Sequence, residues 1–367
     1  MERIVETFIE LVKIDSEAKN EGKFQKYLKE QFEGLGLKVI EDDTMGKTGL
    51  GANNLLCQFP GDLDVAPIFF SAHVDTVTPG VGIQPEIRDG VIYSDGTTIL
   101  AADDKAGIAV MLELVKVIQE ENIPHGLIEF VLTPGEEIGL VGVSAFDVSQ
   151  LQSAYGFVLD NGGPVGSITM ASPTLMGLEV EIIGETAHAG LEPEKGVSAI
   201  EIAAKAISEM TLGRLDEETT ANIGTIAGGT ATNIVADNVI VTAEARSISR
   251  KACEKQMMAM VSAFEDNARQ LGGKVNYSTD IKSIGYRFSE SDPVVQLAAK
   301  AIEAVGRNAS YDVSGGGSDA NVFNAKGKKA LNLSVGYEEI HTLHEYIAID
   351  ELLKALELAV QLVKGTN

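Results

Sequence analysis

The stretch PIFFSAHVD, residues 67–75, is an apolar run that ends directly in a histidine and an aspartate. A short apolar run without alternation is typical of a strand that is buried on both faces of its sheet. In open α/β sheets, ligands bind beyond the carboxyl ends of the strands. His73 and Asp75 therefore stand where this kind of fold places functional side chains.

Similar strands and long helices surround this stretch and define the fold class. The pattern predicts further strands at 37–40, 55–59, 128–132, 157–159 and 330–335, and helices at 21–32, 105–120 and 350–363. Short apolar strands that alternate with long helices predict a mixed-sheet α/β domain that helices cover on both faces.

The pattern changes near residue 172 to strands with one wet face. Leu178, Val180 and Ile182 alternate with Glu179 and Glu181, as in a half-exposed strand. The predicted order that follows is β-α-β-β-α-β, with its first helix at about 195–210, which is typical of a ferredoxin-like α+β unit. We therefore predict a main domain of residues 1–174 and 288–367, with residues 175–287 as an inserted domain.

Composition excludes several classes of function. The 367 residues include 54 acidic and 29 basic side chains, which gives a net charge of −25. Such a chain repels nucleic acids and anionic membranes, because phosphate binding requires clustered lysines and arginines. The only cysteines, Cys57 and Cys253, rule out a disulfide framework, and no apolar run is long enough to span a bilayer. We expect a cytoplasmic protein.

Polar residues collect at the ends of several predicted strands. Glu136 and Glu137 follow the strand at 128–132, Asp160 follows the strand at 157–159, His341 and His344 follow the strand at 330–335, and Asp103 and Asp104 open the long helix. Each group alone has an ordinary structural explanation, such as a helix cap or a turn. Together they form the mixed nitrogen and oxygen donor set that suits Zn²⁺ and related ions.

Several carboxylates in one cleft repel one another, and a pair of divalent cations resolves that repulsion. The residues alone support a two-metal hydrolase and a purely structural cluster about equally.

Eight motifs resemble one enzyme family in their order and approximate spacing. SAHVDTV (71–77), AADDKAG (101–107), PGEEIG (134–139), LDNGG (159–163) and HTLHEYI (341–347) resemble the metal-site motifs of the zinc aminopeptidase/carboxypeptidase/aminoacylase superfamily. AADDKAG and Asp160, together with the motifs AHAG (187–190), GGTATNIVAD (228–237) and AEARS (243–247), are most similar to its peptidase T-like branch. The resemblance covers nearly the whole chain, and it implies that the inserted domain is a lid that also serves dimerisation.

The resemblance implies a role for each motif residue. It makes His73, Asp103, Glu137, Asp160 and His341 metal ligands, with Asp103 bridging two ions and a cis peptide bond between Asp103 and Asp104. It makes Asp75 the residue that orients His73, and Glu136 the general base. The lid residues His188, Asn233 and Arg246 resemble substrate contacts: His188 for the scissile carbonyl oxygen, from a partner subunit's lid in dimeric members, and Arg246 for the substrate's carboxylate.

The implied protein is a metal-dependent exopeptidase, an aminopeptidase that hydrolyses short peptides with a metal-activated water and Glu136. Its implied cofactors are two divalent ions per chain, most often Zn²⁺, with Co²⁺ or Mn²⁺ as alternatives. Its partners would be a short peptide substrate and a second copy of the chain, bound through the lid.

Two alternatives stay open on the sequence. The first is an N-acyl amino acid deacylase or a carboxypeptidase on the same scaffold. The second, of another class, is a non-catalytic relative that binds a metal or a peptide. Glu136 argues against the second, because a binding protein has no use for a base beside the ligand Glu137.

Overall fold

The computed structural model describes residues 2–366, which divide into two compact units. The first unit contains the chain up to Ala171, the segment Phe288–Ser314 and the chain from Ser318 onward. The second unit contains Ser172–Arg287 and the short segment Gly315–Gly317.

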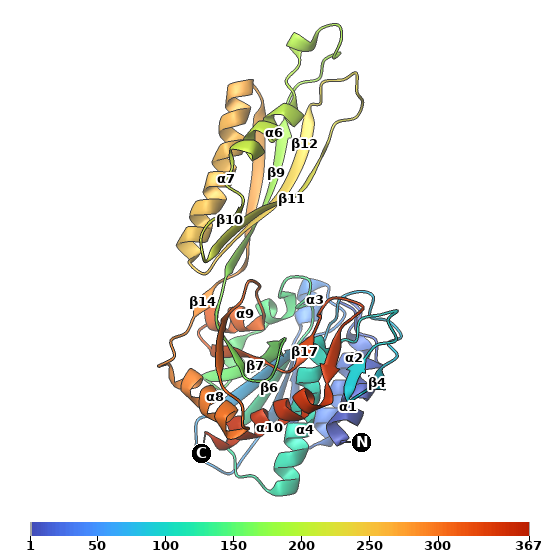
Figure 1. The fold of residues 1–367 in the computed structure, drawn as a ribbon, viewed down its shortest axis with the longest axis vertical. Helices are drawn as coiled ribbons and strands as arrows, with labels where there is room; N and C mark the ends of the chain where they lie inside the picture. Colours follow the sequence, from blue (N-terminus) through green and yellow to red (C-terminus); the bar gives the residue numbers. More distant parts are fainter. Residues whose placement is uncertain (1, 367) are drawn as a thin grey trace. The chain divides into compact units, whose positions relative to one another are not determined.

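A mixed sheet forms the centre of the first unit (Figure 1). Its strands run in the order β1 (Lys38–Glu41), β2 (Leu55–Phe59), β6 (Ile128–Thr133), β3 (Ile68–His73), β7 (Tyr155–Asn161), β16 (Lys329–Ser334) and β8 (Ser167–Ser172), and β15 (Ser310–Val313) pairs with β8. The central strands β6, β3, β7 and β16 are parallel. Their carboxyl ends therefore meet at one edge of the sheet.

Helices cover both faces of this sheet. Phe70 lies in the core that holds α1 (Arg3–Val12), α4 (Ala102–Glu121) and α10 (Ile349–Lys364). Its neighbour Phe69 packs against Phe323 of α9 (Asp319–Ala325), with 4.9 Å between ring centroids. Adjacent residues of a strand point to opposite faces, so β3 is buried on both sides.

Shorter elements complete the first unit. They are α2 (Gly22–Gly34), α3 (Thr44–Thr48), α5 (Val141–Ala145), a 3₁₀ turn (Val148–Gln150) and α8 (Pro293–Ala304). A small antiparallel sheet runs β17 (Tyr337–Glu338), β18 (Tyr346–Ala348), β5 (Val91–Tyr93) and β4 (Glu86–Arg88). The sequence pattern did not predict this sheet, since two- and three-residue strands carry no periodic signal.

The second unit is an antiparallel sheet with two helices on one face. Its strands run in the order β10 (Gly213–Arg214), β11 (Thr219–Gly228), β12 (Asn238–Ser247), β9 (Thr174–Ile183) and β13 (Lys274–Ser283). The helices are α6 (Ala199–Glu209) and α7 (Arg250–Leu271), and the unit also holds a 3₁₀ turn (Pro193–Lys195) and β14 (Tyr286–Arg287). Leu178, Val180 and Ile182 form one core with both helices. The chain order β9-α6-β11-β12-α7-β13 is the ferredoxin-like order.

The predicted fold class is confirmed in both parts, an α/β domain with helices on both faces and a ferredoxin-like insertion. Helix α6 differs in detail, since it begins at Ala199 and not near residue 195. Ser198 is its N-cap and accepts a hydrogen bond from the backbone of Glu201, while Pro193–Lys195 forms a separate 3₁₀ turn. Within residues 2–366, none of the helices combines the length and apolar composition that crossing a bilayer requires.

Phe264→Ala should destabilise the second unit by about 3–5 kcal/mol, because it leaves a cavity in the core under α7. Urea unfolding followed by circular dichroism measures this loss. Met258→Ala on the same helix is the control, since Met258 is 51% exposed and should cost less than about 0.5 kcal/mol. Equal losses in the two variants would contradict this description of the core.

Candidate metal centre

Two histidines and a group of carboxylates converge at the carboxyl edge of the main sheet. His73 ends β3, Asp160 lies near the end of β7, and Glu137 follows β6 in the next loop. Asp103 lies at the start of α4, and His341 lies between β17 and β18. All five belong to the first unit.

The Asp103 carboxylate lies between the two histidines. Its Oδ1 is 2.9 Å from His73 Nε2, and its Oδ2 is 3.3 Å from His341 Nε2. His73 Nε2 also lies 3.8 Å from Asp160 Oδ1, and His341 Nε2 lies 3.0 Å from Glu137 Oε1. The donors thus form two groups, His73 with Asp160 and His341 with Glu137, and each group includes one oxygen of Asp103.

Asp104 lies close to the same donors. His73, Asp104 and Asp160 offer atoms within 4.8 Å of one another, as do His73, Asp103 and Glu137. The Asp104 carboxylate, however, already accepts backbone N–H groups from His73 and Gly107, each at 3.2 Å. The two oxygens of Asp103 face the two imidazoles, so Asp103 is better placed than Asp104 to contact both donor groups. The peptide bond between them is cis, as predicted.

Asp75 connects two strand ends. Its carboxylate oxygens accept the backbone N–H groups of Glu136, at 2.9 Å, and Glu137, at 3.1 Å. The oxygen nearest to His73 Nδ1 is the backbone carbonyl of Asp75, at 2.9 Å, while its carboxylate is 3.6 Å away. The side chain expected to orient His73 therefore also fixes the backbone of the Glu136–Glu137 loop.

Tyr337, which the sequence did not single out, and Asp319 also lie in this part of the molecule. The buried Tyr337 hydroxyl donates a hydrogen bond to Asp160 Oδ1 at 2.9 Å, and the Thr133 hydroxyl donates one to Asp319 Oδ2. Tyr337 is 177 residues from Asp160 in sequence, so no local spacing could reveal this contact. Asp319 belongs to a glycine-rich loop motif that the sequence does show, GGGSD at 315–319.

The electrostatics of the cluster favour bound cations. Burial raises the pKa of the Asp104, Glu136 and Asp160 carboxyls well above their usual values, and neighbouring carboxylates raise it further. Hydrogen bonds to Asp103 and Glu137 raise the pKa of His341 to about 10. Buried carboxylates this close resist ionisation together, and divalent cations with nitrogen and oxygen ligands remove that penalty. The donor set therefore fits the metal ions that the sequence predicted.

The predicted substrate contacts belong to the second unit, and two of them lie side by side. The backbone N–H of Ala189, next to His188, donates to the carbonyl of Asn233 at 3.0 Å. Arg246 lies on β12, where its Nε is 2.8 Å from Glu244 Oε1 and its Nη1 donates to the Gly315 carbonyl at 3.0 Å. The roles of these residues toward a substrate stay predictions.

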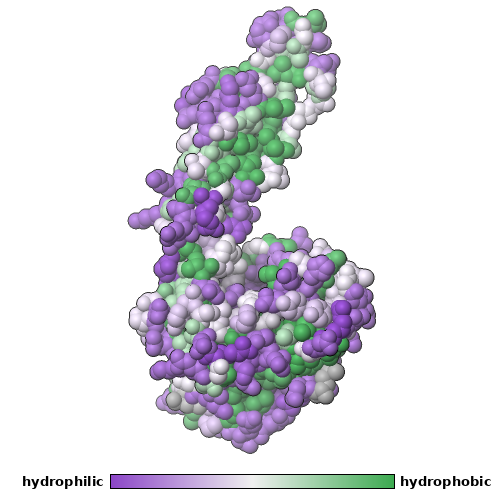
Figure 2. Space-filling view, viewed as in Figure 1, coloured by the Kyte–Doolittle hydropathy of each residue, from purple (hydrophilic) through white to green (hydrophobic). Residues whose placement is uncertain are grey.

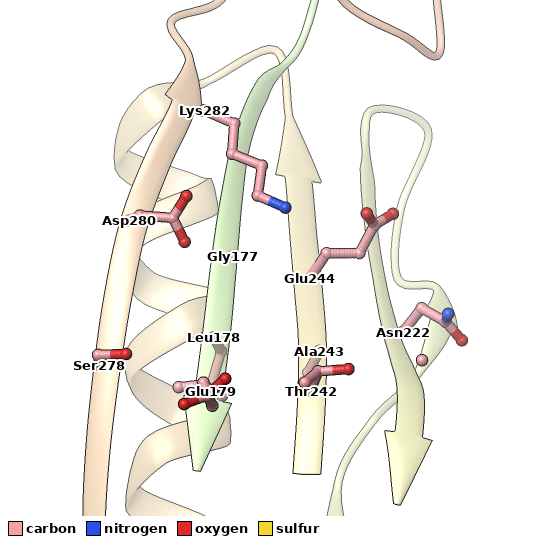
Figure 3. Close-up of a pocket in the computed structure, with 11 residues that line it drawn as sticks. Gly177, Leu178, Glu179, Asn222, Thr242, Ala243, Glu244, Ser278, Asp280 and Lys282 are labelled. Carbon is pink, nitrogen blue, oxygen red and sulfur yellow. The ribbon is translucent and has the colours of Figure 1, made fainter. Parts of the chain in front are cut away.

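A separate pocket of about 370 Å³ lies on the sheet of the second unit (Figure 3). Glu244 of β12 and Asp280 and Lys282 of β13 line it from the two sides of β9, and Gly177 of β9 lies between them. Its lining includes none of the candidate metal ligands.

Two histidines and several carboxylates at the edge of an α/β sheet are typical of hydrolases that use divalent metals. A family model described as Peptidase family M20/M25/M40 matches residues 69–365, and the chain belongs to this peptidase family.

Three relatives are similar over nearly the whole chain. The crystal structure of aminopeptidase PepT from Bacillus cereus is 52% identical with a TM-score of 0.96, covering 100% of this chain and 98% of that one. That of a tripeptidase from Staphylococcus aureus is 45% identical with a TM-score of 0.96, covering 99% and 97%. The protein YqjE of Bacillus subtilis is 50% identical, covering 99% of this chain and 98% of its own length. The predicted resemblance to the peptidase T-like branch is confirmed.

His341→Ala should weaken the stabilisation of the protein by divalent metal, whereas His344→Ala should not. Metal that binds only the folded state stabilises it by about 2.7 kcal/mol at one hundred times its dissociation constant, and His341 faces the cluster. The measurement is the melting temperature of chelator-treated protein titrated with Zn²⁺ or Mn²⁺. The reverse ranking of the two variants would show that the wrong histidine was chosen.

Proposed function

We propose that the protein is a peptidase T-like, metal-dependent aminopeptidase that hydrolyses short peptides with a free N-terminus, including tripeptides. One observation carries the proposal: the Asp103 carboxylate lies between His73 and His341, and Glu136 stands in the loop beside them. Family membership and the similarity to structures described as an aminopeptidase and a tripeptidase support it.

The proposed centre holds two divalent ions. His73, Asp103 and Asp160 would hold one ion, and Asp103, Glu137 and His341 the other, in line with the two donor groups. Zn²⁺ is the first choice for such donors, with Co²⁺ and Mn²⁺ as alternatives. When bound, the two ions lower the pKa of water and polarise the substrate carbonyl.

Glu136 is the proposed general base. Its carboxylate takes one proton from a water molecule while the water oxygen attacks the scissile carbonyl carbon. Glu136 then delivers this proton to the amine nitrogen as the C–N bond breaks, so the products are a carboxylic acid and an amine, which ionise to a carboxylate and an ammonium group. Asp75 holds the Glu136 backbone through its N–H, which keeps the base at a fixed point of the loop.

The second unit supplies the proposed substrate contacts. His188 would donate a hydrogen bond to the oxygen of the scissile carbonyl. Arg246 would pair with the substrate's carboxylate, because its planar guanidinium group can donate two parallel hydrogen bonds to a carboxylate. Asn233 would bind the peptide backbone beside His188. A cytoplasmic location stays a prediction.

Glu136→Gln should lower kcat for an unblocked tripeptide by at least about 10²-fold, because an amide cannot accept the proton. Metal content, measured by elemental analysis, should stay near two ions per chain, since Glu136 is not among the proposed ligands. Full activity in this variant would remove Glu136 from the mechanism.

A substrate panel separates the proposed activity from its alternatives. The aminopeptidase should cleave a tripeptide and leave its N-acetyl form intact. Preferential cleavage of the N-acetyl form would instead indicate a deacylase or a carboxypeptidase. Two bound ions without hydrolysis of either peptide would indicate a non-catalytic relative.

We also propose that the protein forms a homodimer through the second unit. Strand β13 is exposed over most of its length and, among the described residues, pairs along one side only, with β9. Tyr277 and Ile281 on this strand are 44% and 42% exposed. An exposed apolar edge strand favours pairing with another strand. Figure 2 also shows apolar surface on this unit.

A second copy of β13 suits this edge. In an antiparallel pair centred on Tyr277, Lys274 of each copy lies opposite Asp280 of the other, and Val275 lies opposite Thr279. Opposite charges and β-branched residues at facing positions stabilise such pairs.

The double variant Tyr277→Lys/Ile281→Lys should convert a dimer to a monomer, because it places charges on the paired edge. Light scattering after size-exclusion chromatography measures the mass. Ile87→Lys on β4 is the control, since Ile87 is 39% exposed and lies in the first unit. A monomeric wild type at tens of micromolar would refute the proposed dimer.

A further inference from the structure

Glu345 is a buried carboxylate that accepts three backbone hydrogen bonds from one turn. Its Oε2 accepts the N–H groups of Leu100 and Ala101, each at 2.8 Å, and its Oε1 accepts the N–H of Asp103 at 3.0 Å. The side chain is 1% exposed, so water does not compete for these contacts. Both oxygens are engaged by a turn about 240 residues away in the sequence.

The turn that Glu345 holds has an unusual backbone. Ala101 has φ 63° and ψ 33°, in the left-handed region that non-glycine residues rarely adopt, and Asp103 is non-helical although it lies in the first turn of α4. The first N–H groups of a helix lack partners within the helix, and no side-chain cap is present on Ala101. Glu345 Oε1 supplies an acceptor for one of these groups, the N–H of Asp103, and the carboxylate lies at the positive end of α4.

The same short segment also carries His341. Glu345 follows His341 by four residues, and its N–H donates to the Thr342 carbonyl at 3.3 Å. The next residue, Tyr346, enters β18 and pairs with Tyr93 of β5. Glu345 therefore lies between strand β18 and the loop that carries His341. Its carboxylate accepts a hydrogen bond from the backbone of Asp103.

We infer that Glu345 is a positioning residue that sets the separation of His341 and Asp103, and so shapes the half of the centre that these two residues share with Glu137. This inference rests on the proposed two-metal function. Asp103 Oδ2 lies 3.3 Å from His341 Nε2, and both loops that carry these atoms meet at the Glu345 carboxylate. A shift of either loop would move one ligand relative to the other.

The chemistry of the side chain explains why a carboxylate is required. An ionised carboxylate only accepts hydrogen bonds, and here its two oxygens receive three N–H groups. A glutamine has one carbonyl oxygen, so its NH₂ group would face at least one of these donors. The Glu345→Gln change preserves the size of the side chain, but the turn at 100–103 loses at least one of its three hydrogen bonds to residue 345.

Co²⁺ titration of metal-free protein tests this role. We expect Glu345→Gln to bind one of two Co²⁺ ions at least about tenfold more weakly, the usual effect of losing a group that orients a metal ligand. We also expect the visible absorption of the weakened site to change. Glu338→Gln is the matched control, because it removes the same charge from β17 near the same loop, and it should bind Co²⁺ like the wild type.

Wild-type affinity and an unchanged spectrum in Glu345→Gln would overturn the inference, even if the melting temperature fell, because a purely structural residue would alter only stability. If Glu345→Gln does not fold, Glu345→Asp serves instead. It keeps the charge but is shorter by one CH₂ group, and it should weaken the same ion. A wild type that binds no Co²⁺ would refute the proposed function itself, which is a separate outcome.

Discussion

The crowding of buried negative charge at one edge of the main sheet is the constraint on which the rest of the site depends. Asp103, Asp104, Glu136 and Asp160 are largely removed from water, and burial raises the pKa of the last three. Such an arrangement is costly unless cations compensate it. The two histidines supply some compensation, and the position of Asp103 between them divides the donors into two groups that each suit a divalent ion.

Backbone hydrogen bonds to buried carboxylates hold this cluster in place. Asp75 binds the N–H groups of Glu136 and Glu137, and Glu345 binds those of the turn before α4. Tyr337 fixes Asp160 through a hydrogen bond to Oδ1. Each contact joins a segment that carries a candidate ligand to another part of the first unit. The geometry of the proposed dinuclear centre thus depends on residues that are not among its proposed ligands, as is common for metal sites.

The sequence supported much of this in advance because several signals are local. The strand of residues 68–73 ends in His73, and parallel strands bring their carboxyl ends to one edge, so the convergence of His73, Glu137 and Asp160 followed from fold class alone. The choice between His341 and His344 needed the resemblance to a family, since both follow the same strand. The structure places His341 Nε2 3.3 Å from Asp103 Oδ2.

The sequence by itself determined the fold class, the inserted ferredoxin-like unit and the donors at the strand ends, because apolar periodicity and chain order encode them. Only the tertiary structure decided which carboxylate oxygens face which imidazole, that Asp75 holds the loop after β6, and that Glu345 supports the turn before α4. These contacts join residues far apart in the chain, such as Glu345 and Asp103. No spacing rule describes them, because side-chain hydrogen bonds depend on positions fixed to within a few tenths of an ångström by packing.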